Sequence, residues 1–466
     1  MKKAAAIVVF GFLVSSAVFA ELNWSAYGRG VFTPIAFSDG NSSVSAATTT
    51  YGNHGGQPRV GFTVAGVNAS KTIGFTAMFN WDGAPYVGEN ANVWVQPFKF
   101  LKLTVGRFEV DDFRGRIGAA EFSSWILPDG TRDEDAVFMR FKADTGAHLK
   151  VEPLLWWDSP WNGLTIEAAV GSNIGGDRAF KNILDMSASD VYGAIHAGIG
   201  YRIPNIGFAR VQFIGNNREA FWEDYQYANN DVKIRLASGL STWQDADIIE
   251  AAFLYDGIKN LKIEAGIHIP LSYTTSLPDY VYYKGVLDQN AWYHTGNING
   301  RDTLDVTKPM SAVLGATYLW NNFSFLARAD LAWGGKYDHH GERVINIGMD
   351  LGLLAQVYYR FEGIYRVGLD IGYNHHSFDT EEDPAGNRLN IGEREKDIET
   401  SLRNDFGFAP WVAMDLGGGV IKVGVAVMIP SSQRWDYNDT YPGDGWKQLY
   451  SGKPVISIPI SFTYSL

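Results

Sequence analysis

The stretch VIKVGVAVMIP, residues Val420–Pro430, indicates which fold this 466-residue chain adopts. Its aliphatic residues occupy every second position, and Lys422 and Gly424 stand between them. Successive side chains of a β-strand point to opposite faces, so one face of this strand is apolar and the other is polar or small. The same alternation occupies Asn260–Pro270 and Ile456–Leu466. Each run lasts about ten residues, enough for a tilted strand to cross a bilayer, whereas strands of soluble sandwiches average roughly five to six.

Short turns and long polar stretches connect the alternating runs in succession. The eight tight connections are Asn68–Lys71, Phe98–Leu101, Asp158–Gly163, Pro204–Asn205, Asp256–Lys259, Asn321–Asn322, Glu362–Gly363 and Gly417–Gly419. The nine longer polar stretches lie near residues 33–57, 82–90, 109–147, 172–189, 215–245, 269–308, 333–343, 374–404 and 430–453. Eight turns and nine loops join eighteen strands, with sixteen as the alternative. Ala136–Lys142 and Val232–Ala237 are either further strands or hairpins that extend beyond the membrane.

An open sheet edge cannot exist in lipid, because every backbone N–H and C=O group there must be hydrogen-bonded. We therefore predict an all-β fold, a transmembrane antiparallel β-barrel of about eighteen strands that forms one domain over residues 21–466. Short periplasmic turns and long extracellular loops are typical of outer-membrane barrels. Aromatic residues at strand ends are predicted to form two interfacial belts: Trp81, Trp94, Trp156, Trp157, Trp161, Tyr318, Trp320, Trp333, Tyr358, Tyr359, Phe361, Tyr373 and Trp411.

Residues 1–20, MKKAAAIVVFGFLVSSAVFA, are typical of a cleaved signal peptide. Two lysines form a positive n-region, Ala4–Leu13 form an apolar h-region, and Val18–Ala20 form a small-residue cleavage site. The alternative, a membrane anchor, needs about 20 apolar residues. Beyond this segment no apolar run approaches that length, so the sequence predicts export of a protein without a spanning helix.

Composition excludes several classes of protein. The chain has 39 basic and 51 acidic residues, a formal net charge of −12, which argues against nucleic acid as a partner. It contains no cysteine, so disulfides, a thiol nucleophile, a cysteine zinc site and an iron–sulfur cluster are excluded. Without disulfides an exported protein needs another source of stability, and closure of a sheet can supply it.

The C-terminal strand ISIPISFTYSL resembles the assembly signal of bacterial outer-membrane proteins, in which apolar or aromatic residues alternate back from the chain end. The matching residues are Ile458, Ile460, Phe462 and Tyr464. Leu466 departs from the pattern, whose last residue is Phe or Trp. PFKFLKLTVGRF, Pro97–Phe108, resembles the turn-and-strand unit of porins, and the whole mature chain is similar to porin-like barrels of spirochaetes. The resemblance implies outer-membrane lipid and the barrel assembly machinery as partners, and a homotrimer as one oligomeric state.

If the apolar set faces lipid, the other set faces the barrel interior, because a charge near the midplane of the lipid face costs roughly 2–4 kcal/mol. The predicted pore-lining residues are Lys150, Glu152, Glu167, His196, Arg202, Arg210, Lys262, Glu264, Arg328, Asp330, Asp350, Arg366, Asp370, Asp415 and Lys422. Gln212 and Asn346 occupy equivalent positions. Barrels of roughly 16 to 18 strands leave an aqueous channel. Charges that pair with one another and fill a closed lumen are the alternative.

The long stretch 109–147 is the predicted constriction of that channel. It begins DDFRGRIG, so it carries Asp111, Asp112, Arg114 and Arg116, and it later continues TRDED. A loop of this length is usually functional or disordered. Folded inward, its mixed charges would narrow the bore, and a solvated external loop is the alternative.

We expect no enzyme activity, no cofactor and no metal site. No G-x-S-x-G motif occurs, and His196 and His268 have no motif partner. The His-His pairs at 339–340 and 375–376 lie near one rim, but neighbouring histidines of a strand point in opposite directions. An adhesin or surface antigen, or a transporter of hydrophobic substrates, remain as alternatives. The sequence favours an outer-membrane porin for passive diffusion of small hydrophilic solutes.

Overall fold

The structure is a computed structural model that describes the chain in separate stretches. They are residues 21–38, 41–45, 59–81, 85–110, 122–126, 141–157, 163–172, 194–215, 225–226, 232–233, 247–276, 282–284, 292–294, 303–307, 309–339, 343–347, 349–376, 380–382, 403–430, 433–437, 446–451 and 453–465. The predicted signal peptide, residues 1–20, lies outside the described residues. None of the helices within these stretches is both long enough and apolar enough to span a membrane.

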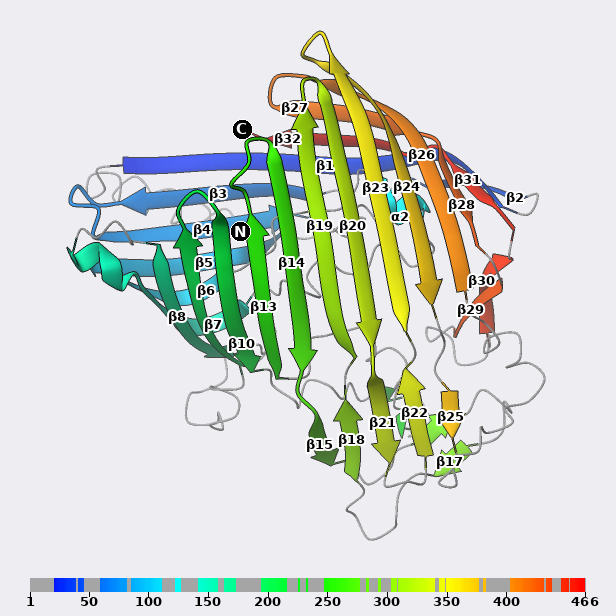
Figure 1. Ribbon diagram of the computed structural model, residues 1–466, viewed down its shortest axis with the longest axis horizontal. Coiled ribbons are helices and arrows are strands. Elements are labelled where there is room, and N and C mark those ends of the chain that lie inside the picture. The colour runs from blue at the N-terminus through cyan, green and yellow to red at the C-terminus, as the bar shows by residue number, and fades with distance from the viewer. Residues whose placement is uncertain are drawn as a thin grey trace, which may run out of the picture.

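One antiparallel sheet closes on itself and forms a barrel (Figure 1). Its circuit follows the chain through β1 (Glu21–Ser38), β3 (Arg59–Val67), β4 (Ile73–Trp81), β5 (Pro85–Phe98), β6 (Leu101–Val110), β7 (Phe141–Val151), β8 (Leu164–Ser172), β9 (Ala194–Ile203), β10 (Gly207–Gly215), β13 (Ile248–Tyr255), β14 (Leu261–Pro270), β19 (Met310–Trp320), β20 (Phe323–Trp333), β23 (Asp350–Phe361), β24 (Tyr365–His376), β26 (Arg403–Asp415), β27 (Gly419–Gly424) with β28 (Ala426–Ile429), and β31 (Val455–Ser457) with β32 (Ile460–Ser465). The last strand pairs with the first, which closes the circuit.

The sheet contains 21 strands, which form a circuit of eighteen crossings among the described residues. β27 and β28 both pair with β26, so they are two parts of one crossing. β31 and β32 both pair with β1 and are likewise one crossing. β3 pairs with the first half of β1, and β2 (Asn41–Ser45) pairs with the second half. β2 therefore continues the crossing that β3 makes and is not counted separately. The predicted antiparallel barrel is confirmed, and its predicted strand number agrees with the number of crossings.

Side chains on the two faces of the wall differ in chemistry. On β26, Phe406 and Val412 are exposed on the outer face, whereas Asp405, Ala409 and Trp411 are buried on the inner face. The same division recurs around the circuit, because apolar residues that are 37% exposed or more alternate with buried inward ones. A closed sheet with an apolar outer surface satisfies every requirement of a lipid environment. The protein is therefore a transmembrane β-barrel of the outer membrane.

Aromatic residues form a continuous group on β19, β20, β23 and β24 beside the short turns. The rings of Trp320 and Phe323 have centroids 5.9 Å apart, and those of Phe323 and Tyr359 are 4.8 Å apart. Phe361 and Tyr365 continue the group at 5.4 Å. Such rings are stable at the level of lipid headgroups, so this group is part of the predicted belt at the periplasmic interface.

Three aromatic residues predicted for the belts lie inside the barrel instead. Trp94 is directly opposite Thr104, which is buried on the inner face. Trp411 is buried on the inner face. Tyr358 is the third residue, and it packs against the cluster that contains Trp411, with the two ring centroids 5.7 Å apart. Proximity to a turn suggested the belt, but the face of a strand residue is set by its position in the alternation. By that criterion all three belong to the inner wall.

Further short sheets lie at the long-loop end of the barrel (Figure 1). One contains β15 (Tyr273–Ser276), β18 (Thr303–Thr307), β21 (Gly335–His339), β22 (Arg343–Ile347) and β25 (Thr380–Glu382), a second contains β11 (Tyr225–Gln226), β12 (Val232–Lys233), β16 (Tyr282–Lys284) and β17 (Trp292–His294), and β29 (Gln433–Tyr437) pairs with β30 (Trp446–Ser451). Asn346 belongs to β22, so its predicted position on the barrel wall is wrong. The chain there pairs with β21 and β25 before it enters the barrel at β23.

The outward face can be tested with an arginine scan by depth. Leu314, in the middle of β19, is 55% exposed on the outer face, and Val60, near the end of β3, is 62% exposed. We expect Leu314→Arg to lower the free energy of unfolding by roughly 2–4 kcal/mol and Val60→Arg by about 0–1 kcal/mol, because the cost falls toward the interface. Denaturant titration of the protein folded in lipid vesicles measures both values. Equal costs for the two variants would contradict the assigned lipid face.

Candidate functional site

Most of the predicted pore-lining residues lie on the inner face of the barrel. Those that are buried there are Glu167, His196, Arg210, Gln212, Glu264, Arg328, Asp330, Arg366, Asp370 and Lys422. Lys150 and Asp415 are partly exposed, whereas Arg202 and Lys262 are exposed, and all four lie near short turns. Glu152 follows the last residue of β7, and its backbone N–H donates to the carbonyl oxygen of Phe100, so its place on the pore wall stays a prediction. Asp350 is the first residue of β23, and its side chain lies outside the described part of the chain.

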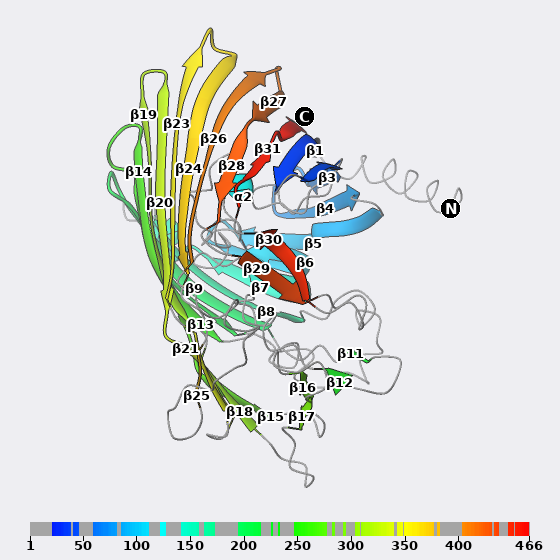
Figure 2. The ribbon, with the colours of Figure 1, turned by 90° about the vertical axis from the view of Figure 1, so that its right-hand side faces the viewer.

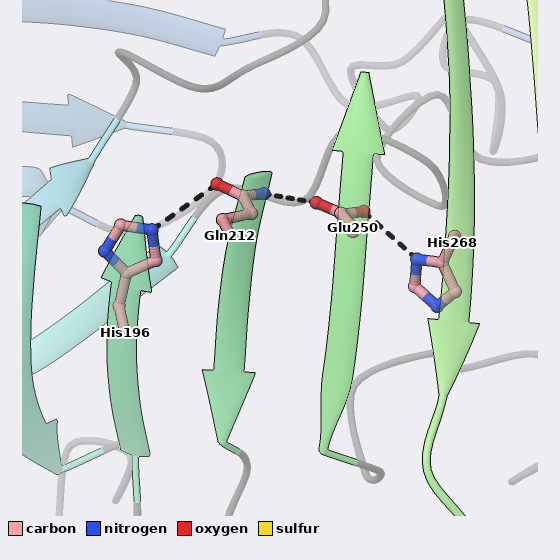
Figure 3. A network of polar contacts seen from close by, with 4 residues as sticks. All are labelled: His196, Gln212, Glu250 and His268. Carbon is pink, nitrogen blue, oxygen red and sulfur yellow. Dashed lines mark hydrogen bonds and ion pairs between the residues drawn. The ribbon is translucent and has the colours of Figure 1, made fainter. Parts of the chain in front are cut away.

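Four inner-face side chains form a hydrogen-bonded row across β9, β10, β13 and β14 (Figure 3). His196 Nε2 and Gln212 Oε1 are 3.4 Å apart, and Gln212 Nε2 donates to Glu250 Oε2. His268 Nδ1 lies 3.0 Å from Glu250 Oε1. The sheet register produces the row, because Gln212 is directly opposite Glu250 and Glu250 is directly opposite His268. All four are buried, and hydrogen bonds between them compensate for the loss of water.

Two ion pairs extend this polar wall. Arg210 Nη2 donates to Glu264 Oε1 at 2.7 Å, across β13, where the small residue Ala252 is directly opposite Arg210. Arg328 donates to Asp330 through Nε and Nη2 at 2.9–3.0 Å, since residues two apart on a strand share a face. Removing one partner of a buried pair typically costs about 3–5 kcal/mol, because the other charge is left uncompensated. The wall therefore carries charges that are held in fixed orientations.

Part of the loop between β6 and β7 lies inside the barrel. The short helix α2 (Ser123–Ile126) contacts β24, β26 and β28, and Figure 2 shows it on the concave side of these strands. Phe122 and Ile126 are fully buried and pack against the inward residues Ala409 and Trp411. The three contacted strands lie six to eight crossings from β6 around the circuit. The segment Phe122–Ile126 thus rests on a part of the wall that is distant from β6.

Asp370 attaches this segment to the wall. Its Oδ2 accepts the backbone N–H of Phe122 at 2.6 Å. Its Oδ1 accepts Nε2–H of Gln356 at 2.9 Å and Nε1–H of Trp411 at 2.8 Å. The carboxyl is fully buried, and a hydrogen bond to a charged group contributes about 1.5–3 kcal/mol. Asp370 is thus a loop-anchoring residue on the inner wall.

Two glycines leave room for the segment. A Cβ atom at Gly407 would lie 1.8 Å from the carbonyl oxygen of Ile126. A Cβ atom at Gly424 would lie 3.1 Å from the ring of Phe122. Any side chain at Gly407 would displace α2, so the wall is shaped for the segment that occupies it.

Sequence reasoning missed three residues of this arrangement. Glu250 stands in IIEAAFLY, where the apolar residues Ala252 and Leu254 share its inward face and hide the alternation. Asp405, fully buried near the start of β26, was assigned to neither face. Phe122 begins the apolar segment FSSWI within a polar loop. Such an apolar segment is a signal that could have indicated a buried part of the loop.

The predicted constriction residues Asp111, Asp112, Arg114 and Arg116 lie outside the described residues, so their role stays a prediction. The described part of the same loop, Phe122–Ile126, lies inside the barrel, and a wholly external loop is therefore ruled out. Within the described ranges no group of three or more histidine, aspartate or glutamate side chains is arranged to hold a metal ion.

No protein-family model matches the sequence, and no curated protein matches it. Similar solved structures include in-vitro folded OmpT, an outer-membrane protein of Vibrio cholerae, with 9% identity, 96% of this chain and 99% of that chain covered, and a TM-score of 0.45. The anion-selective porin from Comamonas acidovorans has 10% identity, covers 96% and 100%, and has a TM-score of 0.44. OccAB1 of Acinetobacter baumannii has 9% identity, covers 96% and 97%, and has a TM-score of 0.46. At TM-scores below 0.5 these likenesses carry no argument about function, and the similarity to spirochaete barrels stays a prediction.

Proposed function

We propose that this protein is a passive porin of the outer membrane, through which small hydrophilic solutes diffuse without cofactor or turnover. The observation that carries the proposal is a closed circuit of eighteen crossings with ionisable side chains on its inner face. Barrels of roughly 16 to 18 strands enclose an aqueous channel, whereas barrels of about eight strands are filled by their own side chains.

The inner wall supports a polar passage. Arg210 with Glu264 and Arg328 with Asp330 place both signs of charge on it. Fixed charges of both signs along a pore orient polar solutes and favour their passage over that of apolar ones. A transporter of hydrophobic substrates would need an apolar wall, so it is less well supported.

Several expectations from the sequence belong to the same proposal. Residues 1–20 would be removed on export, and residues 21–466 would form a single barrel domain. The C-terminal strand would be the signal for the assembly machinery, and the barrel would assemble as a homotrimer. The absence of catalytic turnover is also part of the proposal, and the long loops are compatible with a second role as a surface antigen.

Channel formation is measured directly in a planar lipid bilayer. We expect purified folded protein to give discrete single-channel current steps, because a hydrated lumen conducts ions. The control is the same preparation unfolded before addition. Absence of steps from protein whose circular dichroism shows β-sheet would contradict the porin proposal.

The anchored loop segment predicts a conductance change in Asp370→Asn. An asparagine at this position would turn an NH₂ group toward one of the donors that Asp370 accepts, so the ratio of attached to released loop should fall roughly tenfold or more. We expect higher mean single-channel conductance and more open-channel noise, and deletion of residues 111–135 should give the upper limit.

The matched control is Glu250→Gln, which removes one inner-face negative charge in the row on β13 and does not touch α2. It should leave the loop in place and change conductance less than Asp370→Asn does. Equal currents for the Asp370→Asn variant, the deletion and the unmodified protein would show that the loop does not limit the passage.

A further inference from the structure

Six cations lie at one level of the inner wall, next to the short turns. Each is the second residue from the short-turn end of its strand, on β6, β7, β9, β14, β23 and β24. We call them the basic collar: Lys102, Lys150, Arg202, Lys262, Arg360 and Arg366. No aspartate or glutamate occupies this second position in any of the eighteen described crossings. A collar of one sign is unexpected in a chain with a net charge of −12.

Four of these cations form two like-charged pairs. Lys102 is directly opposite Lys150 on β6 and β7, and Arg360 is directly opposite Arg366 on β23 and β24. Directly opposed like charges destabilise a sheet, because their side chains lie close together on one face. Folding alone would therefore favour a neutral or acidic residue at one member of each pair, and two such pairs at the same level indicate a role in binding.

The two pairs face each other across the barrel. In the circuit of eighteen crossings, β6 and β23 are nine crossings apart in either direction, and so are β7 and β24. Arg202 and Lys262 stand on crossings between them. A solute that enters at the short-turn mouth is therefore approached by cations from opposite sides.

Carboxylates lie beside Arg202, Arg360, Arg366 and Lys150. Asp256 bonds Arg202 at 2.6 Å, and a single carboxylate, Asp415, is shared by Arg366 at 2.5 Å and Arg360 at 3.5 Å. Two more carboxylates adjoin Lys150: Glu167 directly opposite it and Glu152 two residues further along the chain. Lys102 Nζ lies 4.7 Å above the ring of Trp94, a contact that stabilises a cation without cancelling its charge.

Three of the six cations are exposed, whereas Lys102 and Lys150 are half-buried and Arg366 is buried. The side chains of Arg202 and Arg360 are 50% and 46% exposed, and Lys262 is exposed as well. These values contrast with the buried pairs of the wall above, such as Arg210 with Glu264. Guanidinium groups match carboxylate and phosphate oxygens in a two-pronged geometry, and ammonium groups bind the same oxygens as point charges.

We propose that the basic collar is a binding site for small oxyanions, carboxylates or phosphates, at the periplasmic mouth of the barrel. The site makes the channel prefer anions although the chain as a whole is acidic. This inference rests on the proposed porin function for its effect on transport, and binding itself does not require conduction.

The test uses Lys102→Gln/Lys150→Gln, with Lys336→Gln/Lys453→Gln as the matched control. The control also removes two lysine charges, but from exposed positions at the long-loop end. Reversal potentials in a KCl gradient should show anion preference for the unmodified channel and a loss of that preference in the collar variant. The control variant should keep the anion preference of the unmodified channel. Titration calorimetry with inorganic pyrophosphate on folded protein in detergent should show binding that weakens roughly fivefold per collar charge removed.

Each outcome separates the two proposals. Pyrophosphate binding without any single-channel current would overturn the porin function and leave the collar as an anion site. Current without anion preference, together with no pyrophosphate binding, would overturn the collar and leave the porin. An equal loss of pyrophosphate binding in both double variants would also overturn the collar proposal, because binding would then depend on the total charge of the protein and not on the position of the lysines. Arg360→Gln, checked for β-sheet by circular dichroism, repeats the test on the opposite wall.

Discussion

The complete pairing of backbone N–H and C=O groups is the constraint on which this structure depends. An unpaired group in lipid costs several kcal/mol, so the sheet has to end where it begins. The pairing of Tyr27–Phe32 with residues 460–465 meets this requirement. Closure also fixes which residues look inward, because the register of one pair of strands is transmitted around the whole circuit. The inner wall is thus a consequence of backbone chemistry before any side chain is considered.

Once the ladder holds the backbone, the inward side chains are placed by register alone. The row from His196 to His268 exists because opposite residues on β10, β13 and β14 carry complementary donors and acceptors. The same logic explains why a loop can be attached inside the barrel. Asp370 is directly opposite Gln356 and shares a face with Trp411, so its carboxylate is already oriented when Phe122 arrives. The barrel supplies a rigid frame, and the loop contributes only one short apolar segment.

The two-residue period predicted the barrel, its turns and the inward face of most charged residues, because lipid allows one pattern on the outer surface. It failed where that pattern was interrupted. Asn346 continues an alternating stretch, yet its strand leaves the wall and pairs elsewhere. Trp411 stands beside a turn like a belt residue, yet it is buried under Phe122. The position of the loop segment could not be predicted from the sequence, because the residues that leave room for it, Gly407 and Gly424, lie nearly 300 residues further along the chain. Contacts between such distant segments depend on tertiary geometry that periodicity does not encode.

Charge varies along the axis of the wall as well as around it. Lys262 of the collar and His268 of the hydrogen-bonded row stand six residues apart on β14, roughly 20 Å along the strand. Between them Glu264 is committed to Arg210, so the first accessible charges at the periplasmic end are cations and the deeper ones are compensated pairs. Solvent-exposed charges act over roughly 8–10 Å at physiological ionic strength. On β24, Arg366 of the collar and Asp370, which anchors the loop segment, stand four residues apart, roughly 13 Å along the strand. The collar and the anchored segment are therefore separate elements, and we propose that the collar acts on the sign of the solute and the loop on its size.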